Sequence, residues 1–143
     1  MYAEIVDLYL MYGENNLKQL LHDKANISPL NRALENASSE IDGYLNKRYK
    51  TPLLHVPNLV KEWVCIIAFY KLSTDYGAGL TEERRKRYED IFRYLKDIAK
   101  GDAEIPELNN QEDTNLKPQG KDNTIQISCP NRRLITRLSL RRL

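Results

Sequence analysis

The side chains that could carry out chemistry are few in this chain and lie far apart in its sequence. His22 precedes Asp23 and His55 lies between apolar residues, and neither histidine has a partner at the spacing of a metal site. Cys65 and Cys129 form no CxxC pair, and the sequence holds no phosphate-binding glycine loop or G-x-S-x-G motif. It therefore predicts a protein that is not an enzyme and that binds no metal, cofactor or small-molecule substrate. The alternative is a Ser–His–Asp arrangement that only the fold brings together.

A dense basic run consists of Arg84, Arg85, Lys86 and Arg87. Four consecutive residues of a helix point in almost every direction, so one interpretation is a solvated face, with Glu83 paired to Arg87 at four-residue spacing. The other interpretation is a contact with an acidic neighbour or with DNA phosphates.

A second basic segment closes the sequence: Pro130–Leu143 holds five arginines and no acids. Strand spacing and helix spacing fit its apolar residues about equally well, and the short preceding segment Thr124–Cys129 alternates like a strand. We interpret residues 124–143 as an arm that adds a strand to a neighbouring subunit or lays its leucines on one. The alternatives are a basic tail without a defined role and pairing with the acidic residues 102–123 of the same chain. The candidate interaction residues in the arm are Arg132, Arg133, Arg137, Leu138, Arg141 and Arg142.

Helical periodicity dominates the rest of the chain, so we expect an all-α bundle of about five helices, two short and three long. The expected helices span residues 3–12, 14–22, 28–49, 57–76 and 81–101. The fourth is apolar nearly all round, which predicts burial on several sides, with Trp63 central and Cys65 a small buried hydrophobe. Tyrosines beside the apolar stripes suit a core edge or a subunit interface.

The third helix organises the bundle, because its apolar residues recur at three- and four-residue steps from Leu30 to Leu45. We expect Ser28 to cap its start, with Pro29 at the first helical position, and Thr51-Pro52 to end it. Gly43 lies inside this helix, either to admit a neighbouring backbone or as a neutral exposed residue.

The predicted domain organisation has three parts. Residues 1–101 form the helical bundle, residues 102–123 form a flexible polar linker, and residues 124–143 form the basic apolar arm. The linker carries six acids against two lysines, a formal charge of −4, and has too few apolar residues to offset the entropy of ordering it.

Composition narrows the compartment and the class of protein. The formal net charge is +2, so overall charge favours no particular partner. No apolar run reaches the roughly 18 residues needed to span a membrane, and the acidic N-terminus does not resemble a signal peptide. Two separate cysteines fit a reduced cytosolic compartment.

The motif EIDGYL at residues 40–45, followed by Arg48-Tyr49, Pro52-Leu53 and Val56-Pro57, resembles a family of small proteins encoded by Mu-like phages and prophages. The resemblance covers roughly Met1 to Gly101, with a shorter match at Arg132–Leu140. The family is catalogued as a domain of unknown function, lies among head and neck genes, and looks like the helical head–tail adaptors of tailed phages.

The resemblance implies a non-enzymatic virion assembly protein, a head–tail adaptor or head-completion factor. Its partners would be a portal or tail-completion protein and, in a ring, further copies of itself. It would act in the cytoplasm of the bacterial host during assembly and then remain in the virion. The alternative is a small nucleic-acid-binding module that uses the C-terminal arginines and the Arg84–Arg87 run.

Overall fold

A computed structural model of the chain describes residues 1–21, 26–77 and 79–109. This part forms six helices, which confirms the predicted all-α fold. They are α1 (Ile5–Tyr12), α2 (Glu14–Leu20), α3 (Ser28–Leu45), α4 (Asn58–Asp75), α5 (Glu82–Lys100) and α6 (Pro106–Asn109). Predicted features of residues 22–25, Ala78 and residues 110–143, including His22, Cys129, most of the expected linker and the whole arm, lie outside the described residues.

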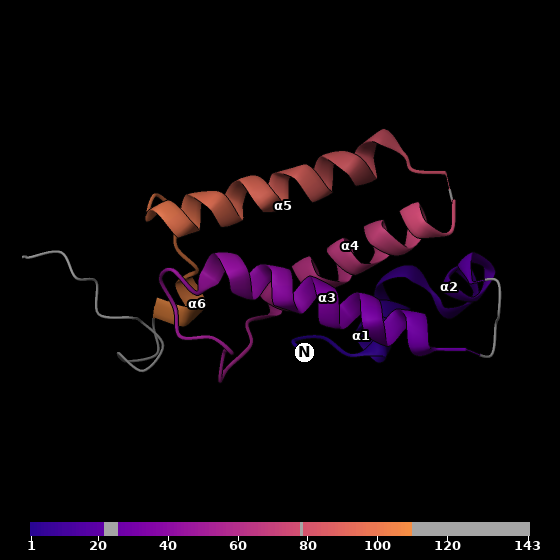
Figure 1. Cartoon of the computed structure of the whole chain (residues 1–143), viewed down its shortest axis with the longest axis horizontal. Helices are drawn as coiled ribbons and strands as arrows, with labels where there is room; N and C mark the ends of the chain where they lie inside the picture. The colour runs from indigo at the N-terminus through magenta and orange to yellow at the C-terminus, as the bar shows by residue number, and fades with distance from the viewer. Residues whose placement is uncertain (22–25, 78, 110–143) are drawn as a thin grey trace, which may run out of the picture.

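The three long helices pack against one another and form the body of the domain (Figure 1). The short helix α1 packs on α4 and α3, and it also contacts α2. Figure 1 shows α6 beneath the end of α5, at the opposite end of the molecule from α2. A single core of buried apolar side chains runs through these elements, from Leu8 in α1 to Leu108 in α6.

The stripe predicted on α3 is confirmed, since Leu30, Leu34, Ile41 and Leu45 are all buried. The predicted N-cap is wrong by one residue. Ser28 is the first helical residue and Ile27 precedes it, while the Ser28 backbone N–H donates to Asn26 Oδ1 at 2.9 Å.

Gly43 is exposed on α3, and a β-carbon built there would meet nothing within 4 Å. This observation favours the second interpretation of Gly43, a neutral exposed residue.

The end of α3 also differs from the prediction, because the helix stops at Leu45 and not at Tyr49. The backbone N–H groups of Arg48 and Tyr49 both donate to the Leu45 carbonyl, at 2.9 and 2.8 Å, so the chain tightens into a turn. This turn carries the Tyr49 ring into the core, where it is fully buried. Its hydroxyl accepts a hydrogen bond from the Ile105 backbone N–H at 3.2 Å.

Helix α4 begins one residue after Pro57 and is buried on several sides, as its composition predicts. Trp63 is only 7% exposed and meets the Tyr94 ring of α5 edge-on, with 5.4 Å between the ring centroids. Cys65 is buried, and burial raises the pKa of its thiol to about 11. The thiol therefore stays protonated at neutral pH, as expected of a small buried hydrophobe.

Helix α5 follows Thr81 and ends where predicted, at Gly101. Gly101 has a φ of +94°, in the left-handed region that L-residues with a β-carbon avoid. At the other end of the helix, the Thr81 side chain makes no capping hydrogen bond.

The first residues of the predicted linker pack onto the bundle, and the described structure continues past residue 101 into α6. Ile105 and Leu108 are buried, the Ile105 backbone N–H donates to the Tyr49 hydroxyl, and α6 begins at Pro106. The Tyr94 hydroxyl donates to the Glu104 carbonyl at 2.9 Å, and the Arg48 guanidinium pairs with the Glu104 carboxylate. Averaged over 22 residues, the segment is too polar to bury, but two of its few large apolar residues, Ile105 and Leu108, fall within its first seven residues.

The N-terminus is held to the bundle by Tyr2, which is buried. Its backbone N–H donates to Ser38 Oγ at 3.1 Å, and its hydroxyl accepts from the Leu53 backbone N–H at 2.9 Å. The same hydroxyl donates to the Asp42 carboxylate. Burial, followed by this hydrogen bond, raises the pKa of the Tyr2 hydroxyl well above its usual value. Tyr2 thereby joins the N-terminus, α3 and the chain before α4.

Candidate interaction surfaces

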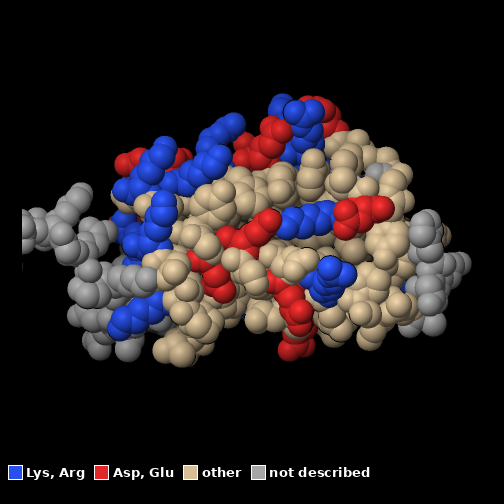
Figure 2. Space-filling view, in the orientation of Figure 1, with Lys and Arg blue, Asp and Glu red and all other residues tan. Residues whose placement is uncertain are grey.

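The predicted basic run occupies the first two turns of α5, and all four of its side chains are exposed. Figure 2 shows Lys and Arg side chains along the edge where α5 lies, with acidic side chains between them. An ion pair at four-residue spacing does form in this run, but it joins Arg85 to Glu89, at 2.9 Å, and not Glu83 to Arg87. The run is therefore partly neutralised, as the solvated-face interpretation requires.

Arg84 has a packing role within the run. Its guanidinium lies over the Phe69 ring of α4, 4.9 Å from the ring centroid. Phe69 in turn stacks on Tyr12 of α1, with 3.8 Å between the centroids. Contacts of this kind between a cation and an aromatic face are worth about 0.5–1 kcal/mol at an exposed site. The stack links α5, α4 and α1, so a charge that was a candidate for partner binding is partly committed to the fold.

Beside this stack lies a hollow of about 330 Å³, which we call the Arg84 groove. It is lined by Tyr12, Ile66, Phe69, Tyr70, Thr81, Glu83, Arg84 and Arg87. Burial raises the pKa of Tyr12 to about 12, although the two arginines act in the opposite direction, so its hydroxyl stays protonated and can donate. Two cations and three hydroxyl groups against one carboxylate make this groove suited to an acidic side chain of a partner.

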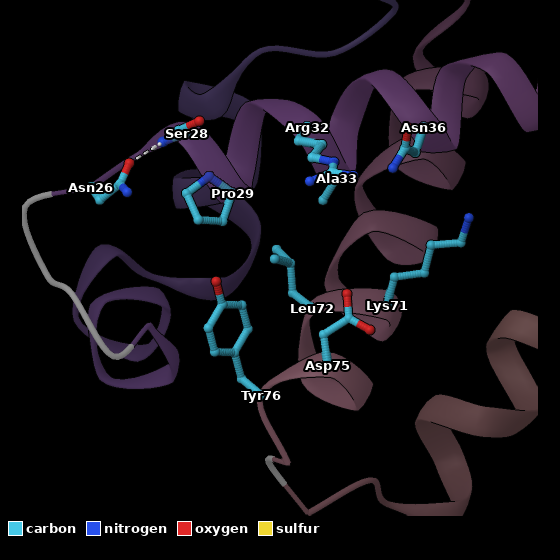
Figure 3. A pocket seen from close by; sticks show the side chains of 10 residues that line it. All are labelled: Asn26, Ser28, Pro29, Arg32, Ala33, Asn36, Lys71, Leu72, Asp75 and Tyr76. Atoms are coloured by element: carbon cyan, nitrogen blue, oxygen red, sulfur yellow. Dashed lines mark hydrogen bonds between the residues drawn. The ribbon is translucent and has the colours of Figure 1, made fainter.

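A larger hollow, of about 520 Å³, lies between the start of α3 and the end of α4 (Figure 3). Figure 3 shows Pro29 and Arg32 of α3 on one side and Leu72 and Asp75 of α4 on the other. Arg32 and Asp75 offset each other in charge, and Lys71 at the rim pairs with Glu40 at 2.6 Å. The hollow therefore has no preference for an ion of either sign.

Helix α1 exposes apolar side chains on the face turned away from the core. The exposed fractions are 59% for Val6, 82% for Leu10 and 41% for Met11. The sequence pattern predicted a helix over residues 3–12 but not this exposed apolar face. The signal was present in the helix sequence IVDLYLMY, where Asp7 is the one charged residue and apolar residues are not confined to one stripe.

A hollow of about 350 Å³ adjoins this face, between α1 and the first turns of α4. Its lining includes Asp7, Leu10 and Met11 from α1, together with Glu62 and Cys65 from α4. Asp7 and Glu62 both line the hollow, and their negative charges add to the effect of burial in raising the Cys65 pKa. Apolar surface and acidic groups are thus combined at one place.

The structure brings together no metal-ligating cluster of three or more His, Cys, Asp or Glu side chains among the residues it describes. His55 is exposed in the segment between α3 and α4. Of the helices in the described ranges, none combines the length and the apolar character that crossing a membrane requires. The arm candidates Arg132, Arg133, Arg137, Leu138, Arg141 and Arg142 lie outside the described residues.

Comparison with known proteins places the chain among phage proteins. Residues 2–123 match the family described as "Bacteriophage Mu, Gp36". "Gene product J" of Escherichia phage Mu is 32% identical over 126 residues, which is 85% of this chain and 85% of that protein. "Mu-like prophage FluMu protein gp36" of Haemophilus influenzae is 42% identical over 69 residues, 48% of this chain and 47% of that protein.

These matches define a phage-related protein, and the residues that the structure describes give it an all-α fold. Because the family match covers most of the sequence, the chain belongs to the Bacteriophage Mu Gp36 family. This confirms the resemblance to Mu-like phage proteins noted from the EIDGYL motif. The family match ends at residue 123, before the segment Arg132–Leu140, where we noted a second resemblance.

Proposed function

We propose that this protein is a non-enzymatic assembly factor of a Mu-like phage or prophage, acting as a head–tail adaptor or head-completion protein. The observation that carries the proposal is membership of the Mu Gp36 family along residues 2–123. The helical bundle agrees with the likeness to helical adaptor proteins that the sequence indicated. As part of the proposal, the protein acts in the host cytoplasm during assembly and then remains in the virion.

In this proposal the bundle is the scaffold of one subunit, and its surfaces make the contacts. The Arg84 groove offers cations and hydroxyl donors, and the α1 face offers apolar side chains beside carboxylates. Surfaces of such different chemistry on one small domain fit a subunit that meets different neighbours. The partners would be a portal or tail-completion protein and further copies of the chain.

The test is deletion of the gene from an inducible prophage, with the intact gene supplied on a plasmid as the control. An adaptor or head-completion factor is needed after the head forms, so we expect DNA-containing heads and separate tails in lysates of the deletion strain. Electron microscopy of negatively stained lysates counts heads, tails and complete virions. Complete virions at the control level in the deletion strain would refute the proposal.

A binding experiment tests whether the Arg84 groove makes the contact with a partner. The full tagged chain, purified from induced cells after light cross-linking, is expected to retain a portal or tail-completion protein. As a matched pair, Arg87→Glu changes the Arg84 groove, whereas Lys86→Glu changes the neighbouring exposed charge, which does not line that groove. A loss of capture with Arg87→Glu alone would assign the contact to the groove.

The second candidate function is nucleic-acid binding, and the exposure of Lys86 and Arg87 on α5 favours it. Binding to phosphates weakens steeply as salt rises, because the protein displaces cations condensed on the nucleic acid and their release becomes less favourable at high salt. We expect that a fluorescence anisotropy titration of the full chain with duplex or single-stranded DNA shows no binding at low salt. Binding that falls steeply between about 50 and 200 mM salt would instead favour this second function.

A further inference from the structure

The exposed apolar residues of α1 form one continuous patch. Val6 and Leu10 are four residues apart, as are Asp7 and Met11, so the four side chains share one side of the helix. Leu8, on the other side, is fully buried, which fixes the orientation of the helix on the bundle. Single exposed apolar residues are ordinary on protein surfaces, whereas a group of them beside a hollow indicates a docking site.

The border of this patch is acidic. Asp7 belongs to the patch itself, Glu62 of α4 lines the adjoining hollow, and Glu4 is exposed just before the start of α1. Lys61 also lines the hollow, but the two carboxylates of Asp7 and Glu62 outnumber its one ammonium group, so the net charge of the lining is negative. The surface therefore suits a segment that offers leucines together with cations.

The chain itself contains such a segment. Pro130–Leu143 combines Leu134, Leu138 and Leu140 with five arginines and has no acids. Twenty residues separate its start from Asn109, where α6 ends. Extended chain covers about 3.3–3.6 Å per residue, so this connection can span roughly 65–70 Å. A domain of this size has a radius of gyration of about 13 Å, so the tether can reach an adjacent subunit.

We propose that the α1 face, formed by Val6, Leu10 and Met11 beside Asp7 and Glu62, receives the C-terminal arm of a second copy of this chain. The contact is heterologous, because the arm of one copy meets the helix of the next, and repeated contacts of this type close into a ring when the rotation between copies allows it. This inference rests on the proposed function in one respect, since an adaptor acts as an assembly of several copies.

The test uses two full-length copies made together during prophage induction, each with a different affinity tag. One copy carries a photo-reactive amino acid at Leu10, and the other is unmodified. A matched control carries the same group at Leu54, which is 75% exposed but lies between α3 and α4 and does not line this hollow. Products are purified through both tags, and the joined peptides are identified by mass spectrometry.

We expect the Leu10 copy to be joined to residues 130–143 of the other copy, and the Leu54 control to give at least tenfold less of this product. In the Leu10 experiment, Glu62→Arg should reduce the yield about threefold or more, because it replaces attraction of the arginines by repulsion. Glu107→Arg, at an exposed residue of α6, should leave the yield unchanged.

Three results would overturn the inference: joining of Leu10 only to the arm of its own chain, joining only to a different virion protein, or no product with the arm. Its failure is distinct from failure of the proposed function. Deletion of the gene can give tailless heads even if Leu10 never meets the arm, and the arm can join Leu10 even if deletion leaves virions intact.

Discussion

The hydroxyl of Tyr2 gives the sharpest test of how this domain is held together. It accepts a hydrogen bond from the buried backbone N–H of Leu53 and donates one to the carboxylate of Asp42. Tyr2→Phe removes the hydroxyl and keeps the ring, so the packing of the side chain is preserved. The substitution therefore isolates two polar contacts that tie the N-terminus to α3 and to the chain before α4.

The cost of Tyr2→Phe follows from the groups left behind. Leu53 is 6% exposed, so water cannot readily replace the lost partner of its N–H group. A buried donor without an acceptor costs about 1–3 kcal/mol. Asp42 is half-buried, so water can replace much of its lost contact. We expect a loss of about 2 kcal/mol of unfolding free energy at pH 7, which lowers Tm by roughly 6–12 °C in a domain of this size.

The measurement is urea unfolding of the full chain followed by far-UV circular dichroism, with Tyr70→Phe as the matched control. Tyr70 stacks on Tyr88 with 4.1 Å between centroids, and its hydroxyl makes no hydrogen bond to the residues that the structure describes. Its substitution should change the free energy by less than about 0.5 kcal/mol. If Tyr2→Phe also stays within that limit, the reasoning from a buried unpaired N–H is refuted.

The same variant predicts a dependence on pH. The pKa of Tyr2 is raised in the folded protein, so above about pH 10 the unfolded chain loses this proton while the folded protein keeps it. The contribution of Tyr2 to stability is therefore complete below pH 10 and falls by up to about 1.4 kcal/mol per pH unit above it. The stability advantage of the natural protein over Tyr2→Phe should shrink between pH 10 and 11, and a constant difference would contradict this cause.

Three further predictions concern the packing of the bundle, and each is measured by urea or thermal unfolding. Trp63→Ala should cost about 3–5 kcal/mol, because it empties a buried site and removes an edge contact; a cost below about 1.5 kcal/mol would mean that the site is not part of the core. Gly43→Ala, in open space on a helix, should stabilise by up to about 1 kcal/mol, whereas Gly101→Ala, at positive φ, should destabilise by about 1–2 kcal/mol; equal effects would contradict the assigned conformations. A chain ending at residue 101 should be less stable than one ending at residue 109 by at least about 2 kcal/mol, because it lacks the buried Ile105; equal stability would show that residues 102–109 add nothing to the core.

The helices could be predicted from the sequence because each carries its own periodic signal. The stripe from Leu30 to Leu45 and the apolar length of α4 are local patterns, and both are buried as expected. The end of α5 at Gly101 could also be predicted locally, because glycine readily adopts the positive φ that the chain has there. These features depend on neighbours within a few residues, which one sequence displays directly.

Features that depend on distant contacts were not predictable in the same way. The sequence predicted that α3 continues to Tyr49. In the structure the Tyr49 ring is buried in the core, and its hydroxyl accepts a hydrogen bond from the Ile105 backbone N–H. The same contact helps to hold residues 103–109 against the bundle. The burial of Tyr2 likewise depends on Ser38 and on Leu53, far away in sequence. Contacts between residues so far apart in sequence cannot be predicted from local sequence patterns.

The candidate site was predicted only in part. The Arg84–Arg87 run is exposed as the sequence indicated, but the use of Arg84 against Phe69 needed the relative placement of α5 and α4. The apolar character of α1 was visible in composition alone, yet a helix whose apolar residues are not confined to one stripe does not show which of them remain exposed. Only the packing of Leu8 and its neighbours decides that question.

The closing turn at Tyr49 and residues 103–109 has a mechanical consequence. A tension applied to the chain after Asn109 does not peel the last turn of α5 directly, because Glu104 and Ile105 are fastened to Arg48, Tyr49 and Tyr94. The load is divided between the ends of two long helices, and several contacts must fail together before either helix unwinds. Tension applied after Asn109 is therefore shared by α3 and α5 and does not act on one helix alone.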